Sequence, residues 1–270
     1  MKHRQTDIRL DELQELSALR SLPRPVYGHV HGLANRAIGH RHRHPWTQLS
    51  YAAHGVIEVV TDNARYMAPP LHAIWIPAGV AHAVHRFEGT EIRSLYMATD
   101  ALDALDEAGK GCRVVEVTPL LRELIRTFGD YPVEYDEDGS HGRLVRVLLD
   151  QLQQATEADL AVPWPGDPRL RKICRALEAH PGDERRLSDH ARRLAVSEKT
   201  LSRLFLQQTG LTFRAWRQRL RMLVALPMLE RGDRVTDVAV SCGYDSMSAF
   251  IAAFRLFTGV TPGEFFHRKT

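Results

Sequence analysis

The sequence is poor in cysteine. It contains Cys112, Cys174 and Cys242, and no two of them form a CxxC pair. A framework of structural disulfides and a cysteine-based zinc site are therefore not expected, which favours a reducing compartment. No apolar run approaches the roughly 20 residues of a membrane-spanning helix, and the first residues lack the apolar core of a signal peptide. We expect a cytoplasmic protein with no membrane partner.

The C-terminal region has few acidic residues relative to basic ones, and the N-terminal region has the opposite balance. Residues 168–270 contain 19 Lys and Arg against 10 Asp and Glu, whereas the first 167 residues contain 17 against 23. A basic C-terminal region suits a polyanionic partner such as DNA, although a solvated basic surface is the simpler alternative for charge alone. The length of 270 residues and the hydrophobic fraction of 44% allow two globular domains and a connector.

The stretch from Val235 to Pro262 has the pattern of a helix-turn-helix unit. A short helix is predicted before a turn at Gly243, and a second helix follows with Ser246 as its N-cap and Gly259 beyond its end. Apolar residues at helical spacing define the buried face of the second helix: Phe250, Ala253, Phe254 and Phe257. In such units the second helix enters the DNA major groove.

This pattern occurs twice in the chain. Ser197 corresponds to Ser246, 49 residues later, and Gly210 corresponds to Gly259 in the same way. Further pairs are Leu187 and Val235, Asp189 and Asp237, Ala191 and Ala239, Leu201 and Phe250, Phe205 and Phe254, and Thr212 and Thr261. Two units in tandem are a more specific signal for DNA binding than one. The segment between them, Thr212 to Glu230, is predicted as a linker helix with several arginines and Pro227 inside it.

These residues resemble the AraC family of bacterial transcription regulators. The resemblance covers about the last hundred residues and rests on Gly243, Phe250, Phe254, Arg255, Gly259, Thr261 and Pro262, with the upstream copy around Leu187 to Gly210. It implies a DNA-binding domain at 166–270, with helix-turn-helix units at 187–209 and 235–257 and a linker helix at 212–230. The implied partners are a double-stranded DNA operator, a second copy of the chain and, for an activator, RNA polymerase. DNA binding itself requires no cofactor.

The outward faces of the two recognition helices carry the candidate DNA contacts. These are Lys199, Ser202 and Arg203 on the first helix and Ser248, Ile251 and Arg255 on the second. Arg203 is the best candidate for a base contact, because a guanidinium can bond O6 and N7 of guanine together. Lys199 and Arg255 suit phosphate, and Ile251 suits a thymine methyl. We predict that most base discrimination comes from the first unit.

From Val26 to about Thr99, short strand patterns separated by Pro and Gly predict a small β-barrel or sandwich. Within it His42 and His44 alternate, Gln48 follows, and the motif Pro77-x-Gly79-x-x-His82 lies downstream. This two-part pattern is similar to the signature of cupin barrels, in which three histidines and a glutamate hold a divalent cation. Here Gln48 stands at the glutamate position, and the usual glycine of the first motif is absent.

The cupin resemblance implies a metal site formed by His42, His44, Gln48 and His82. Three converging imidazoles suit Zn, Ni, Cu or Fe(II). The alternative is that the histidines are polar residues in a pocket for an organic effector. Four aromatic residues are candidates for the walls of such a pocket: Trp46, Tyr51, Trp75 and Tyr96.

Helical patterns follow the strand region. Residues 117–128 begin with an N-cap at Thr118, and residues 143–156 carry an apolar stripe of Leu144, Val147, Leu148 and Leu152. That stripe either packs on the barrel or pairs with a second subunit, and the family resemblance favours a homodimer. Residues 162–166 are predicted as a stiff linker.

The sequence therefore predicts an α+β protein in four parts. They are an N-terminal segment at 1–25 with a short helix at 7–20, a cupin-like domain at 26–99, a helical connector at 100–165 and the DNA-binding domain. The favoured function is a sequence-specific transcription regulator that responds to a small-molecule or metal effector. The alternative is a metal-dependent cupin enzyme, an oxygenase or isomerase, for which the sequence offers no catalytic acid or base.

Overall fold

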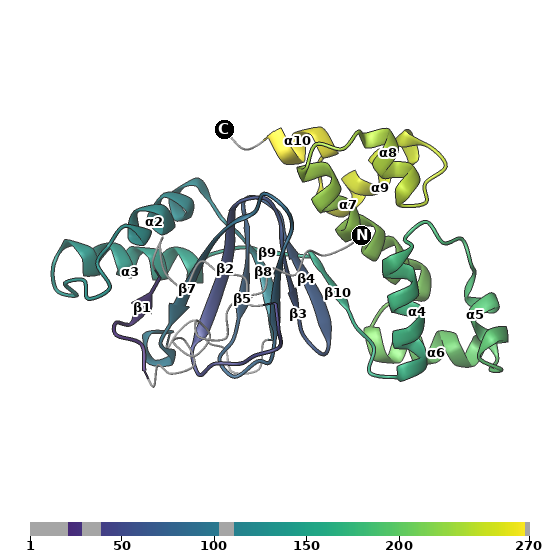
Figure 1. The fold of residues 1–270 in the computed structure, drawn as a ribbon, viewed down its shortest axis with the longest axis horizontal. Helices are drawn as coiled ribbons and strands as arrows, with labels where there is room; N and C mark the ends of the chain where they lie inside the picture. Colours follow the sequence, from purple (N-terminus) through teal and green to yellow (C-terminus); the bar gives the residue numbers. More distant parts are fainter. Residues whose placement is uncertain (1–20, 29–38, 103–110, 268–270) are drawn as a thin grey trace. The chain divides into compact units, whose positions relative to one another are not determined.

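The computed structural model describes residues 21–28, 39–102 and 111–267 (Figure 1). The described residues form two compact units: those up to residue 61 together with those from 66 to 160, and residues 62–65 together with those from 161 onward. The predicted helix at 7–20 lies outside the described residues. As predicted, the fold is α+β, with a strand-rich N-terminal unit and a helical C-terminal unit. No helix of the described part of the chain is long and apolar enough to cross a membrane.

In the part of the chain that the structure describes, ten strands form two sheets. The six-stranded sheet has the order β1 (Val26–Tyr27), β7 (Glu91–Met97), β2 (Thr47–His54), β5 (His72–Ile76), β8 (Arg113–Glu116) and β9 (Glu157–Ala158). The four-stranded sheet has the order β10 (Ala161–Pro163), β4 (Ala64–Ala68), β3 (Ile57–Val60) and β6 (Ala83–Arg86). A 3₁₀ turn follows β7 at Thr99–Leu102. The predicted strands at 56–61, 73–76, 82–87 and 92–98 are thereby confirmed, within a residue or two of their ends.

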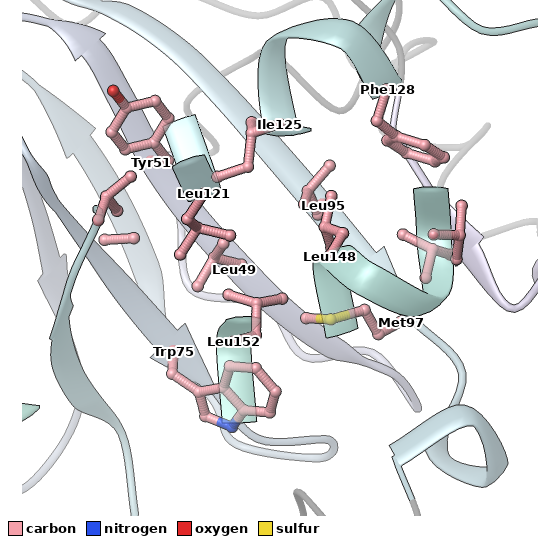
Figure 2. Close-up of a cluster of buried hydrophobic side chains, with 14 of the residues drawn as sticks. Leu49, Tyr51, Trp75, Leu95, Met97, Leu121, Ile125, Phe128, Leu148 and Leu152 are labelled. Carbon is pink, nitrogen blue, oxygen red and sulfur yellow. The ribbon is translucent and has the colours of Figure 1, made fainter. Parts of the chain in front are cut away.

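Strand β2 is central to the N-terminal unit because it pairs with both β5 and β7. Successive side chains of a strand point to opposite faces. Leu49 and Tyr51 enter a core covered by helices α2 (Pro119–Gly129) and α3 (Ser140–Gln153), as Figure 2 shows. Gln48 and Ser50 therefore face the opposite side, and both are buried polar residues.

The two covering helices begin where local sequence dictates. Thr118 Oγ1 accepts the backbone N–H of Leu121 at 3.2 Å, and Pro119 occupies the first turn, as predicted. Helix α3 buries Gly142, Val145, Leu148 and Leu152. The predicted stripe was wrong at one position, since Val147 is 43% exposed and Val145 takes its place in the core. The helix therefore packs on the sheet through a face rotated slightly from the predicted one.

The sequence pattern predicted a helical connector at 100–165, but this region is only partly helical. It contributes β8, β9 and β10, whose short runs gain stability only from partners far away in the chain. The predicted linker at 162–166 begins as strand β10 instead. Within the C-terminal unit the backbone N–H of Trp164 donates to the backbone carbonyl of Asn63 at 2.6 Å. The ring centroids of Trp164 and Trp216 are 5.6 Å apart. These contacts order a segment that the Pro and Gly content alone marks as a connector.

Besides β10, the C-terminal unit contains seven helices among the described residues. They are α4 (Pro168–Ala179), α5 (Leu187–Arg193), α6 (Glu198–Thr209), α7 (Phe213–Glu230), α8 (Val235–Ser241), α9 (Met247–Thr258) and α10 (Pro262–His267). Helices α6 and α9 have the predicted caps: Ser197 and Ser246 each accept a backbone N–H at 3.1 Å. Gly210 and Gly259 end these helices with φ of 70° and 82°.

Helix α7 joins the two helix-turn-helix units through its arginines. Arg217 donates to the Arg185 carbonyl, on the side of the first unit, at 2.9 Å. Arg221 donates to the carbonyls of Pro181 and Gly243 at 2.9 and 3.0 Å, and Gly243 is the turn glycine of the second unit. These two basic side chains are therefore used inside the domain. The helix runs through Pro227 without interruption.

Candidate functional site

The three histidines of the cupin-like motif come together in the N-terminal unit. His42 and His82 form an isolated antiparallel bridge, with backbone N–H donors to each other's carbonyls at 2.9 Å. His44 lies in the segment that leads into β2, and its ring centroid is 5.1 Å from that of His82. One ring nitrogen of each histidine lies within 4.8 Å of the others. The geometry thus brings together all three imidazoles that the sequence pattern selected.

Backbone carbonyls determine which ring nitrogen of each histidine is available. Nδ1 of His44 lies 2.8 Å from the Trp46 carbonyl oxygen, Nδ1 of His82 2.9 Å from that of Val80, and Nδ1 of His42 3.0 Å from that of His40. A carbonyl can only accept, so each Nδ1 carries the proton and donates. Each Nε2 is then left with a lone pair, which is the arrangement by which proteins orient histidines for a metal.

The Gln48 amide lies beside two of these lone pairs. Its Oε1 is 3.0 Å from Nε2 of His44 and 3.2 Å from Nε2 of His82. Bonds of about 2.0–2.1 Å around a tetrahedral ion separate neighbouring ligand atoms by about 3.4 Å. Nε2 of His42 is buried and has no hydrogen-bond partner among the described residues. The donor set of three nitrogens and one oxygen therefore fits a divalent transition metal.

Burial keeps the three rings neutral. It lowers the pKa of His42 to about 4 and that of His82 to about 3, and it lowers the pKa of His44 as well. The neutral imidazole is the form that binds a metal, so no proton competes for these nitrogens near pH 7.

Two of the four candidate pocket aromatics lie beside the triad. Trp46 stacks on His44 with centroids 5.6 Å apart, and Tyr96 meets His44 edge-on at 5.4 Å. Tyr51 and Trp75 instead belong to the helix-covered core (Figure 2). The four aromatic residues therefore do not line one pocket, because the alternation of β2 separates Tyr51 from Gln48. The sequence pattern also gave no signal for Ser94, whose Oγ lies 3.4 Å from Nε2 of Gln48.

The candidate DNA contacts of the first helix-turn-helix unit lie together on the exposed face of α6. Lys199, Ser202 and Arg203 are exposed, and Leu201 and Phe205 are buried on the opposite face. Arg203 makes no ion pair with any residue that the structure describes. The pattern had missed Leu206, which is 50% exposed at a position 49 residues before Arg255.

The second recognition helix, α9, has a more apolar outward face. Ser248 and Arg255 are exposed and Ile251 is half-buried, with Phe250 and Phe254 fully buried beneath them. The outward side chains line an open hollow of about 680 Å³, formed by Ser248, Ile251, Ala252, Arg255, Leu256, Gly259 and Thr261. Leu256, which the sequence pattern had not singled out, is 83% exposed at its edge.

Together these features define a class of protein. The C-terminal unit presents two helix-turn-helix units joined by one helix, and the N-terminal unit is a double β-sheet with a polar, histidine-rich interior. This is the organisation of a DNA-binding regulator that carries its own sensor domain.

Comparisons with known proteins identify the family. Residues 26–152 match the model of the AraC-like ligand binding domain, and residues 190–268 match that of a helix-turn-helix domain. The HTH-type transcriptional regulator NimR of Escherichia coli K12 is 34% identical over 241 residues, which cover 89% of this chain and 87% of that protein. RipA of Corynebacterium diphtheriae is 36% identical over 101 residues, 37% of this chain and 30% of that protein. Among solved structures, ToxT of Vibrio cholerae matches over 91% of this chain and 97% of its own, with 14% identity and a TM-score of 0.38.

The chain belongs to the AraC family of helix-turn-helix transcription regulators, with an AraC-like ligand-binding domain at its N-terminal side. It is a DNA-binding regulator and not a cupin enzyme, since the relatives that it matches are regulators.

Proposed function

We propose that this regulator senses a divalent transition metal bound by His42, His44 and His82, with Gln48 as the fourth ligand. The observation that carries the proposal is the orientation of the three rings. Each Nδ1 donates to a backbone carbonyl, which leaves three Nε2 lone pairs and one amide oxygen in one small region. A set of three nitrogens and one oxygen suits Zn, Ni, Cu or Fe(II).

The bound metal would act as an effector. It would add a double positive charge and would link Gln48 on β2 to the segment around His42 and to His82, which lies just before β6. An effector changes DNA affinity only to the extent that it binds one state of the protein more tightly than another. The regulator therefore needs two states that differ in metal affinity, and the triad is the part of the N-terminal unit that an ion would rigidify.

The DNA-binding unit would read adjacent major-groove segments through α6 and α9. Arg203 is assigned to a guanine and Lys199 to phosphate, with Ser202 between them. On α9, Ile251 is assigned to a thymine methyl, Arg255 to phosphate, and Ser248 to a base or the backbone. The first unit supplies most of the discrimination between bases, because it holds the guanidinium that can make a bidentate base contact.

The functional form would be a homodimer acting on an operator in the cytoplasm. Helices α2 and α3 pack their buried faces on the sheet, yet Leu120 is 53% and Val147 43% exposed. Large exposed apolar side chains on neighbouring helices support association of this surface with a second copy. Sedimentation of the wild type and of Val147→Glu tests it: a dimer that becomes a monomer supports the assignment. RNA polymerase is a further partner if the protein activates transcription.

Metal analysis combined with DNA binding tests the proposal. The full chain is purified without chelator, its metal content is measured, and its affinity for an operator selected from random duplexes is compared before and after metal removal. One ion per chain, lost in His82→Ala, with a change in operator affinity, is the expected result. Operator binding that is indifferent to metal would refute the sensing role while leaving DNA binding intact.

A further inference from the structure

The candidate metal site is formed only by neutral groups. The three imidazoles are uncharged, and Gln48 stands where a carboxylate would otherwise supply negative charge. Among the described residues, the cluster of possible metal-binding side chains contains no aspartate or glutamate. A divalent ion here would keep its full double charge in a buried setting, and an uncompensated buried charge is costly.

A second observation concerns Trp46, which stacks on His44. Trp46 is 3% exposed, and its Nε1 is buried without a hydrogen-bond partner among the described residues. An indole N–H is a donor only and normally finds an acceptor when it is buried. The triad is thus flanked by an unused donor as well as lacking negative charge. An anionic oxygen ligand would supply both missing parts.

The approach to the triad is also positively charged. His82 is fully buried and His44 is 7% exposed, whereas His42 is only half-buried. Arg41 and Arg43, on either side of His42, are exposed. Guanidinium groups attract carboxylates and raise the local concentration of anions. Access from the His42 side therefore favours a negatively charged ligand.

From these observations, and resting on the proposed metal site, we infer that the effector is a metal ion together with a small carboxylate. The carboxylate would bind the ion directly as an additional ligand and accept the Trp46 N–H. Gln48 is then the residue that makes the site dependent on this co-ligand. A glutamate at the same position would neutralise part of the charge and remove the need for an external anion. The sensor would respond to the metal and the anion jointly, and not to either alone.

Cobalt(II) is a suitable probe because its visible absorption reports its ligands. Metal-free full-length protein is titrated with Co²⁺ in acetate and, at equal ionic strength, in perchlorate, which coordinates weakly. We expect acetate to tighten Co²⁺ binding by about tenfold, within the range typical of coupling between two ligands, and to change the visible spectrum. In Gln48→Glu, Co²⁺ should bind tightly in perchlorate, and acetate should have little further effect.

Trp46→Phe is the second variant, since it keeps an aromatic ring beside His44 and removes the N–H together with the five-membered ring that carries it. Its Co²⁺ affinity in perchlorate should equal that of the wild type, while the effect of acetate should shrink. Thermal melting of the metal-free variants checks that each is folded. If wild-type protein binds Co²⁺ equally in acetate and perchlorate, the carboxylate inference is wrong and the metal site stands. If wild-type protein binds no Co²⁺ under either condition, the metal site itself is refuted, and the inference with it.

Discussion

Replacement of Arg203 by alanine should remove sequence preference, and not merely weaken DNA binding. Arg203 projects from α6 between Lys199 and Leu206 on the exposed face, and no described residue forms an ion pair with it. A bidentate arginine–guanine contact is worth about 1–3 kcal/mol of discrimination. This corresponds to a loss of about 5- to 150-fold in affinity for the preferred site. Affinity for random DNA should fall much less.

The salt dependence of binding distinguishes a base contact from a phosphate contact. Each phosphate that a protein neutralises contributes about −0.9 to the slope of log affinity against log salt. Arg255→Ala should reduce the magnitude of that slope by about 0.9, the value for one phosphate contact. It should weaken the affinity for specific and for random DNA equally. Arg203→Lys keeps the charge but loses the bidentate geometry, so it should lose preference with little change in slope.

The assay is fluorescence anisotropy at several salt concentrations, with an operator selected from random duplexes and an unrelated duplex. Arg175→Ala, an exposed arginine on α4, serves as the control for loss of one positive charge. Its ratio of specific to random affinity should match that of the wild type. If Arg203→Ala leaves the ratio intact while Ser248→Ala abolishes it, the second unit reads the bases and the assignment is reversed.

Three further predictions concern stability. Leu148, on the inner face of α3, is fully buried, so Leu148→Ala should cost about 3–5 kcal/mol in urea unfolding; a cost as small as that of Val133→Ala, at an exposed position, would contradict the packing. Gly259→Ala places a Cβ in open space at φ 82° and should cost about 1–2 kcal/mol. Gly243→Ala should cost more, because its Cβ would lie 2.6 Å from the Arg221 guanidinium and 2.8 Å from the Gly182 backbone; equal melting temperatures would contradict this ranking. A divalent metal at a hundred times its dissociation constant should stabilise the N-terminal unit by about 2.7 kcal/mol, and His82→Ala should show no such shift on chelator addition.

Features with local sequence signals were predictable. The caps at Thr118, Ser197 and Ser246 each need only a hydroxyl three residues before a backbone N–H, and the structure contains all three bonds. The αL glycines Gly210 and Gly259 are equally local. The histidine triad was also recognisable, because its spacing matches a known signature.

Features that depend on strand register were not predictable in the same way. Trp75 lies opposite Leu49 only because β5 pairs with β2, a contact between distant segments. That Trp75 lies away from the histidine triad can therefore be predicted only when the strand pairing of the sheet is known. Tyr51 is a different case, since its odd spacing from Gln48 on one strand already places the two on opposite faces. The short strands β8 to β10 give too little pattern for detection without their partners.

The most direct test of metal sensing is metal content measured together with operator binding. Full-length wild type and the His42→Ala/His82→Ala double variant are purified in parallel, analysed for metal, and titrated with the selected operator with and without metal. The account predicts one ion per wild-type chain, none in the double variant, and an operator affinity that changes with metal only in the wild type. Wild-type protein that holds no metal and binds the operator identically in all conditions would contradict it.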